Sequence, residues 1–191
     1  PCPDARWPEL SGNETSVYYI EPGSSGDGSS PDTPMGSINA ALALAAPGST
    51  MVLGAGTFTE SIQLPSNIHL KGLCSTKTIL RVASSNEPIV LVTGQDSTIT
   101  DVTLRDGQPT VEVNPSASIS IIGSTIKDSK NAALVINNEA KASVVQTSIH
   151  STDAFSATAE QNEGTAIVNR GVELNLDRVS IESSAGSALF N

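Results

Sequence analysis

Four six-residue segments in the second half of the chain resemble one another and recur at a nearly constant spacing. They read ITDVTL, IIGSTI, VVQTSI and LDRVSI, and they begin at Ile99, Ile121, Val144 and Leu176. The first two intervals are nearly equal and the last is clearly longer. A fixed period of this kind is typical of a solenoid, in which each repeat forms one coil that stacks on the next. The sequence predicts coils of about 22 residues, with one insertion over 152–163.

An asparagine recurs in a second column of the same repeat. The runs VEVN, LVIN, AIVN and ALFN end at Asn114, Asn137, Asn169 and Asn191, and the one long interval again falls across the insertion. Asparagine tolerates the left-handed backbone region, and its side-chain amide can both donate and accept hydrogen bonds. The spacing predicts a ladder of asparagine side chains at a tight bend.

Each coil contains three short runs rich in Val, Ile and Thr, which favour strands. In the first complete coil they cover 102–104, 110–113 and 117–121. Stacked coils place equivalent residues about 4.8 Å apart, and only parallel strands satisfy that register. Because just 3% of the 191 residues are aromatic, we expect an aliphatic core. The predicted fold is an all-β, single-stranded, right-handed parallel β-helix.

The first part of the chain lacks the repeat. Residues 1–35 are expected to form an N-terminal arm, a short strand at 17–20 and a loop rich in Gly, Ser, Pro and Asp. Residues 36–191 would form the β-helix domain. Ser37 is well placed as the N-cap of a helix over 37–46, which Pro47 and Gly48 end. Such a helix would cap the open end of the solenoid.

These features resemble the pectin-lyase-like superfamily of right-handed parallel β-helix proteins. The asparagine column and the three-run coil carry the likeness, together with the stretch SINAALALAAPGSTMVLGAGTFTESIQLPSNIHLKGL at 37–73. That stretch is similar to the N-terminal entry of pectin methylesterases and related surface proteins, with GTFTE at 56–60 for their GxYxE-like element. The resemblance implies the fold but no single activity, because this fold hosts lyases, hydrolases, esterases and adhesins. The other catalytic motifs of these enzyme families are absent from the sequence.

Charge and cysteine content bear on location and partners. Twenty acidic and ten basic residues give a net charge of −10, which disfavours binding to nucleic acid or to an anionic membrane. No apolar run approaches the roughly 20 residues of a membrane span. We expect a secreted or cell-surface protein, or the ectodomain of a lipoprotein. Cys2 and Cys74 are predicted to form a disulfide; the alternatives are a lipid-modified Cys2 or two unrelated thiols.

One outward column of the repeat carries the candidate site residues. Leu104, Ile126, Ile149 and Ile181 would point inward, so the residues that follow them point out; these are Arg105, Lys127, His150 and Glu182. One position further, stacking would set Asp106 and Asp128 about 5 Å apart, close enough to share a proton or to bind Ca²⁺. Lys127 or Arg105 could then act as the base of a lyase. The alternative is ordinary turn chemistry on a solvated face.

Two further elements complete the candidate sites. The insertion would overhang the outward column and bring Phe155 to it as an aromatic lip for a sugar. In the first loop, Asp27 and Asp32 offer oxygen ligands for Ca²⁺, with a solvated loop as the alternative.

Three functions fit these observations. The leading hypothesis is a non-catalytic extracellular or cell-surface module that contacts carbohydrate, adheres to a surface or acts as a structural spacer. The first alternative is a polysaccharide lyase or another carbohydrate-active enzyme acting on acidic glycans. The second is a self-assembly module, because Asn191 stands in mid-coil and would leave an open sheet edge. No cofactor is expected, and Ca²⁺ is the candidate ion.

Overall fold

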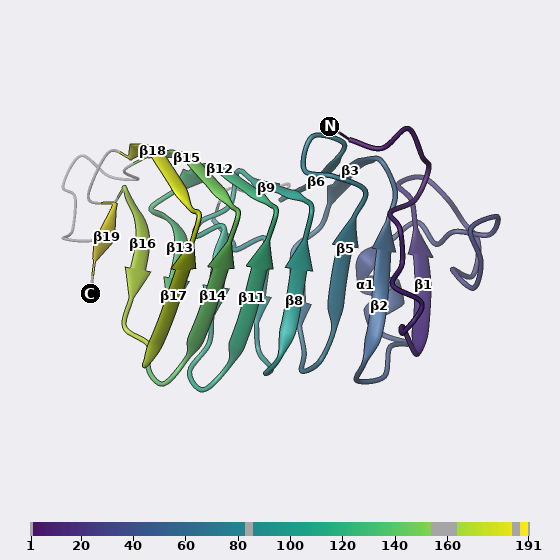
Figure 1. Ribbon diagram of the computed structural model, residues 1–191, viewed down its shortest axis with the longest axis horizontal. Helices are drawn as coiled ribbons and strands as arrows, with labels where there is room; N and C mark the ends of the chain where they lie inside the picture. The colour runs from purple at the N-terminus through teal and green to yellow at the C-terminus, as the bar shows by residue number, and fades with distance from the viewer. Residues whose placement is uncertain (1, 83–85, 154–163, 185–187, 191) are drawn as a thin grey trace.

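The computed structural model describes residues 2–82, 86–153, 164–184 and 188–190, and within them the chain winds into coils that stack along one axis (Figure 1). Each complete coil gives one strand to each of three sheets. Neighbouring strands in all three sheets run parallel. The predicted parallel β-helix is therefore confirmed. None of the helical structure in the described part of the chain has the length and hydropathy to cross a membrane.

Each sheet is defined here by its strands, in their order across the sheet. Sheet A contains β1 Ser16–Ile20, β2 Ser49–Leu53, β5 His69–Gly72, β8 Ser97–Thr100, β11 Ser118–Ile122, β14 Lys141–Val145 and β17 Glu173–Asp177. Sheet B contains β3 Gly56–Thr59, β6 Thr78–Arg81, β9 Thr103–Arg105, β12 Thr125–Lys130, β15 Ser148–Asp153 and β18 Ser180–Ser184. Sheet C contains β4 Ile62–Leu64, β7 Val90–Val92, β10 Val111–Val113, β13 Ala132–Ile136, β16 Thr165–Asn169 and β19 Leu189–Phe190.

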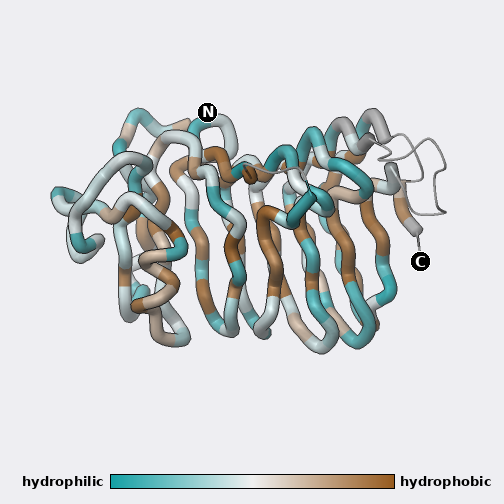
Figure 2. The backbone as a smooth tube through the Cα atoms, turned by 180° about the vertical axis from the view of Figure 1, so that it is seen from behind, coloured by the Kyte–Doolittle hydropathy of each residue, from teal (hydrophilic) through white to brown (hydrophobic). Residues whose placement is uncertain are grey.

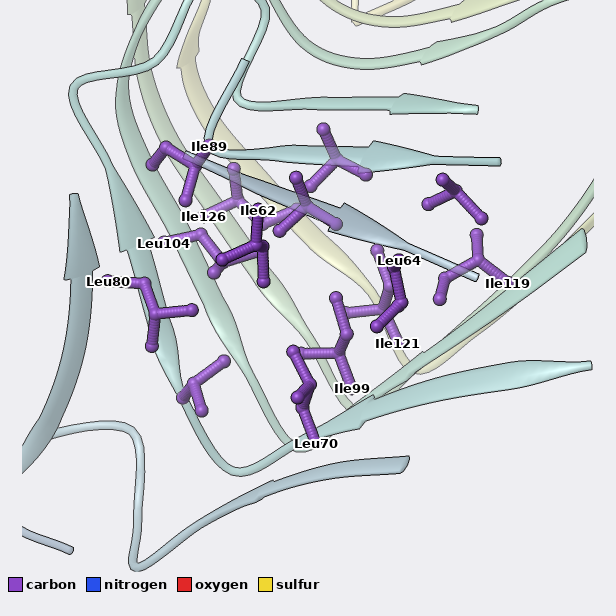
Figure 3. Packing of buried hydrophobic residues seen from close by; sticks show 14 of the residues in the cluster. Ile62, Leu64, Leu70, Leu80, Ile89, Ile99, Leu104, Ile119, Ile121 and Ile126 are labelled. Carbon is purple, nitrogen blue, oxygen red and sulfur yellow. The ribbon is translucent and has the colours of Figure 1, made fainter. Parts of the chain in front are cut away.

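Aliphatic side chains form continuous columns inside the coils. On sheet B, Leu80, Leu104, Ile126, Ile149 and Ile181 are direct partners on successive strands. Figure 3 shows the side chains of Leu80, Leu104 and Ile126 inside the coils, across from the equivalent column of sheet A, Leu70, Ile99 and Ile121. Ile126 and Ile149 are fully buried. The inward direction predicted for this column is confirmed.

The alternation of side chains along each strand explains why this sequence forms a coil filled by its own residues. Successive strand residues point to opposite faces, so β11 reads as half-exposed Ser118, buried Ile119, half-exposed Ser120 and buried Ile121. Figure 2 shows apolar segments along the strands and hydrophilic ones at the turns of several coils. Stacking then buries each aliphatic residue against the same kind of residue in the next coil.

A short helix closes the N-terminal end of the core. Helix α1 covers Ile38–Leu42, and the Ser37 hydroxyl accepts a hydrogen bond from Ala40 N at 3.2 Å, as expected of the N-cap. The helix is shorter than the predicted 37–46, because Leu44 and Ala45 donate to carbonyls three residues earlier and so form tighter turns. Ile38 and Ala41 are fully buried in the common core, which agrees with a capping role.

Glu60 fixes the start of α1 from a distant part of the chain. Its carboxylate accepts hydrogen bonds from the Ser37 hydroxyl at 2.7 Å, from Ile38 N at 2.9 Å and from Asn39 N at 3.0 Å. The first amides of a helix have no partners within the helix and favour negative charge. The last residue of the GTFTE element therefore holds the cap onto the first coil.

The N-terminal arm lies against the first coils and is tied to them covalently. Cys2 and Cys74 form a disulfide with their Cα atoms 5.7 Å apart, as predicted. Further along the arm, Arg6 pairs with Glu21 at 2.7 Å, and the Trp7 ring packs edge-on against Tyr19 at 5.2 Å. The arm is thus a fixed part of the surface, although its described residues before β1 contribute no strand to any sheet.

The register corrects the predicted asparagine ladder at one step. Asn114 and Asn137 follow the paired residues Val113 and Ile136, so they are equivalent. Asn169, however, pairs with Ile136, one position away from Asn137. The chain between β13 and β16 contains one residue more than an unbroken ladder would need. The pairing of the two strands is therefore shifted by one residue, as the pair Ala132 and Thr165 also shows. The Asn137 amide donates instead to the Glu112 carboxylate at 3.1 Å.

The first testable prediction compares Asn137 with its neighbour. Replacing Asn137 by alanine removes the hydrogen bond to half-buried Glu112 and is expected to lower the free energy of unfolding by about 0.5 to 1.5 kcal/mol. Asn138 is exposed, so the same replacement there should have a much smaller effect. Urea unfolding of the two variants measures the difference. Equal effects would show that the Asn137 side chain contributes nothing specific to the bend.

The insertion begins later than predicted. Thr152 and Asp153 belong to β15, where Thr152 pairs with Ser129 on one side and with Ser184 on the other. The sequence prediction of 152–163 therefore took the end of a strand as loop, because the Ser-Thr-Asp run there is also common in turns. The remaining residues of the predicted insertion lie outside the described part of the chain.

Candidate functional site

The outward residues of sheet B form a charged column, defined here as Arg81, Arg105, Lys127, His150 and Glu182. These five residues are partners on β6, β9, β12, β15 and β18. The predicted column from Arg105 to Glu182 is thus brought together by the fold. Arg81 was missed, although it follows inward-pointing Leu80 just as Arg105 follows Leu104. The interval from Arg81 to Arg105 is longer than the two intervals that follow it, because the first coils do not share the exact repeat.

Arg105 lies between the two aspartates that were predicted to face each other. Its Nε is 3.1 Å from Asp106 Oδ2, and its Nη2 is 3.0 Å from Asp128 Oδ2. Arg81 Nε adds a longer contact to Asp106 at 3.5 Å. A guanidinium thus occupies the position between Asp106 and Asp128, and the predicted sharing of a proton or a cation would require Arg105 to move.

The backbone explains how both aspartates reach the arginine. Asp106 and Asp128 have φ angles of +72° and +53°, in the left-handed region that aspartate tolerates better than most residues. Asp106 directly follows β9, whereas Asp128 lies within β12. The alternative interpretation, ordinary turn chemistry, therefore does not describe Asp128, which is a strand residue.

The rest of the column is less constrained. His150 Nδ1 lies 3.4 Å from Glu182 Oε2. In the part of the chain that the structure describes, the Lys127 ammonium has no ion pair and no hydrogen bond. Phe155 and Asn191 fall outside the described residues, so the aromatic lip and the self-association through the last coil stay predictions.

Of the two aspartates in the first loop, Asp27 forms hydrogen bonds within the loop itself. Asp27 accepts hydrogen bonds from Ser29 N at 3.0 Å, from the Ser29 hydroxyl at 2.7 Å and from the Thr33 hydroxyl at 2.9 Å. The backbone hydrogen bond from Ser29, followed by the two hydroxyls, lowers the pKa of Asp27 to about 2. Asp32 takes no part in this set. Among the described residues, no group of three or more His, Cys, Asp or Glu side chains is placed to hold a metal ion.

A different polar site lies on sheet A and was not predicted. A groove of about 510 Å³ runs over β2, β5, β8 and β11, with Thr50, His69, Thr98, Thr100 and Ile122 in its floor. The N-terminal arm forms one wall with Ser11, Asn13, Glu14 and Thr15. We call it the arm groove. No local sequence signal predicts it, because its wall and its floor come from parts of the chain that are far apart in the sequence.

Asp101 is one of the residues that line the arm groove. No hydrogen bond or ion pair to its carboxylate is found in the described part of the chain. Gly123 has a φ of +61°, which disfavours other residues there, and a Cβ at this position would come within 2.6 Å of Asp101 Oδ1. Burial raises the pKa of Asp101, and the charge of Lys71 partly opposes this.

The raised pKa has a defined consequence for stability. The folded protein favours protonated Asp101 more than the unfolded chain does. The resulting stabilisation is fully present below the unfolded pKa near 3.9 and is lost as pH rises through the folded pKa. At neutral pH the ionised carboxylate therefore destabilises the folded protein, and a ligand that donates to it could relieve this cost.

Comparisons with known proteins concern the fold. No protein-family profile and no curated protein sequence matches this chain. Among solved structures, pectate lyase Pel9A matches 92% of this chain with a TM-score of 0.66 and 20% identity. A pectin methylesterase in complex with a hexasaccharide and pectin methylesterase PemA from Erwinia chrysanthemi each match 90% at 12% identity, with TM-scores of 0.54 and 0.53.

The lengths differ: this chain spans 49% of pectate lyase Pel9A and 68% of each methylesterase. At these identities the likeness shows the fold alone. It agrees with the three parallel sheets and with the resemblance noted from the sequence. The chain therefore has the right-handed parallel β-helix fold that pectate lyase Pel9A and the pectin methylesterases share.

Proposed function

We propose that this chain is a non-catalytic extracellular β-helix module that contacts carbohydrate through the charged column of sheet B. One observation carries the proposal: Arg105 bridges Asp106 and Asp128 at 3.1 and 3.0 Å. These three residues were the candidate base and the candidate cation ligands of a lyase. In this arrangement they form ion pairs with one another.

The bridge engages one of the two candidate bases, Arg105, and both candidate cation ligands, while Lys127 stays outside it. A guanidinium stays protonated at physiological pH, so Arg105 would have to lose both partners and its proton to act as a base. A cation between Asp106 and Asp128 would have to displace the same guanidinium. The arrangement is suited to hydrogen bonding and charge contact rather than to proton abstraction.

The geometry of the column is suited to a repeating ligand. The side chains at Arg81, Arg105, Lys127 and His150 rise at the strand spacing of about 4.8 Å. They present nitrogen donors at regular intervals, and among the described residues the Lys127 ammonium stays outside the neighbouring ion pairs. The similar solved structures support carbohydrate as the ligand class, since they are a pectate lyase and pectin methylesterases, one in complex with a hexasaccharide.

Two properties support an extracellular or cell-surface location. The disulfide between Cys2 and Cys74 is a bond that persists in oxidising compartments and is rare in the cytosol. The net charge of −10 favours solubility and disfavours adhesion to anionic membranes. A surface location also fits a module that meets polysaccharide outside the cell.

The test combines an activity assay with a binding assay. Incubation with polygalacturonate and Ca²⁺ should give no rise in absorbance from unsaturated products, and affinity electrophoresis in gels containing polygalacturonate should retard the protein. Replacing Lys127 by glutamine should weaken this binding about two- to fivefold, as expected for one solvent-exposed charge contact.

Lys77→Gln is the matched control, because it removes the same charge where the ammonium contacts the carbonyl of Pro3 in the arm. It should leave the retardation unchanged. Unsaturated product would overturn the non-catalytic assignment in favour of the lyase alternative. Equal retardation of the parent and the Lys127 variant would show that the column is not the contact surface.

A further inference from the structure

The outward face of sheet A carries a row of polar side chains that runs through the arm groove. Thr50, His69, Thr98, Ser120, Ser143 and Asn175 are direct partners on β2, β5, β8, β11, β14 and β17. All six can both donate and accept hydrogen bonds, the histidine in its neutral form. We call them the polar row.

Two hollows follow this row and meet at Thr98. The arm groove, of about 510 Å³, lies over β2, β5, β8 and β11. A second hollow of about 370 Å³ continues over Ser120 and Ser143. Each volume is in the range of ligand sites in proteins. Together they form a path across the sheet that follows the polar row, with one step per coil at about 4.8 Å.

The groups at the arm end of the path set the chemistry of a ligand. The Asp101 carboxylate has no close partner among the described residues and can only accept hydrogen bonds when ionised. Lys71 donates to the carbonyl of Glu9 and retains two further ammonium hydrogens. His69 already shares a hydrogen bond with Thr98 at 2.9 Å. A ligand here must donate to the carboxylate and accept from the ammonium within a short distance.

We propose that the arm groove and the polar row form a second carbohydrate site, which binds a neutral β-1,4-linked hexose chain. A sugar hydroxyl both donates and accepts, so it can serve Asp101, Lys71 and the hydroxyls of the row alike. An extended β-1,4-linked chain also advances per residue by nearly the strand spacing, so successive sugars meet successive coils. The site is separate from the charged column and does not depend on the role proposed for it.

The charge of the groove argues against other ligands. An acidic glycan would meet Asp101 and Glu14, and a cationic ligand would meet Lys71. Glu14 is already held in the arm wall by Ser11 and Gly12 amides at 2.9 and 2.8 Å, so its carboxylate is a fixed negative group. An uncharged polyhydroxyl chain is the ligand that avoids both repulsions.

The experiment is a titration of isotope-labelled protein with cellohexaose and, separately, with mannohexaose, followed by amide chemical shifts. At least one of the two sugars should shift the amide signals of Thr98, Thr100 and Ser120, and leave those of Lys127 and His150 on sheet B unchanged.

The first variant tests the carboxylate. Asp101→Asn, which keeps the shape of the side chain and tolerates the φ of +58°, should weaken binding about five- to tenfold, because a charge-assisted hydrogen bond becomes a neutral one. Its control is Asp177→Asn, the same change on the same face but outside both hollows.

A second pair of variants tests the row. Ser143→Leu fills the path and removes a hydroxyl, so it should weaken binding at least about fivefold. Val145→Leu, two residues along β14 and outside both hollows, should bind as the parent does. Each variant is first checked for an unchanged melting temperature; Asp101→Asn should melt no lower than the parent at pH 7, because the ionised carboxyl is disfavoured by burial.

Three results would overturn the proposal. These are no shifts with either sugar, shifts confined to sheet B, or unchanged binding in both Asp101→Asn and Ser143→Leu. Loss of polygalacturonate retardation in the Lys127 variant concerns only the charged column, so the two proposals succeed or fail separately.

Discussion

Replacing Ile126 by alanine is expected to lower the free energy of unfolding by about 2 to 5 kcal/mol, the usual cost of deleting several buried methyl or methylene groups. Ile126 is fully buried, between Leu104 in the coil before and Ile149 in the coil after. Each neighbour would lose contacts at the cavity, and stacked coils cannot close it without shifting their strand register. Urea unfolding followed by far-ultraviolet circular dichroism measures the loss.

The next residue along the chain is the matched control. Lys127 pairs with Arg105 and His150 on the outward side of the same strand, so Lys127→Ala should change the free energy of unfolding by no more than about 0.5 kcal/mol. The comparison tests the direction of the side chains directly. Similar losses in the two variants would contradict the inward and outward assignment for this column.

Removing the disulfide is expected to have the second large effect. Cys2 and Cys74 are 72 residues apart, and closing a loop of that length in the unfolded chain is worth about 4 kcal/mol in the chain-entropy model. A variant with alanine at both positions should therefore melt well below the parent under non-reducing conditions. The parent treated with a reductant should behave like the variant.

The arm makes other contacts that limit this loss. Arg6 pairs with Glu21, and Lys77 donates to the carbonyl of Pro3 at 3.0 Å. A variant that is destabilised by less than about 1 kcal/mol would mean that these contacts, rather than the covalent bond, hold the arm. The mature protein should also yield no free thiol on alkylation followed by mass spectrometry.

Sequence alone determined the coil and the direction of its side chains. The repeat places Leu104, Ile126 and Ile149 at equivalent positions, and because strand side chains alternate with a period of two, the residues after them had to point outward. The same local rules identified the N-cap at Ser37. The sequence also predicted that Cys2 pairs with Cys74, with a lipid-modified Cys2 or two unrelated thiols as alternatives, and the structure shows the disulfide.

Tertiary structure decided where neighbouring coils differ and where distant segments meet. The pairing of Ile136 with Asn169 moved that asparagine out of the ladder, and no local pattern encodes the length of the path between β13 and β16. The repeat placed Asp106 beside Asp128, but only the folded structure shows that Arg105 reaches both of them. The arm groove depends on segments that the folding of the coils brings together from distant parts of the chain. Periodicity fixes which way a side chain points, because that is a property of the local backbone, whereas its partner depends on contacts across coils that the sequence pattern does not specify.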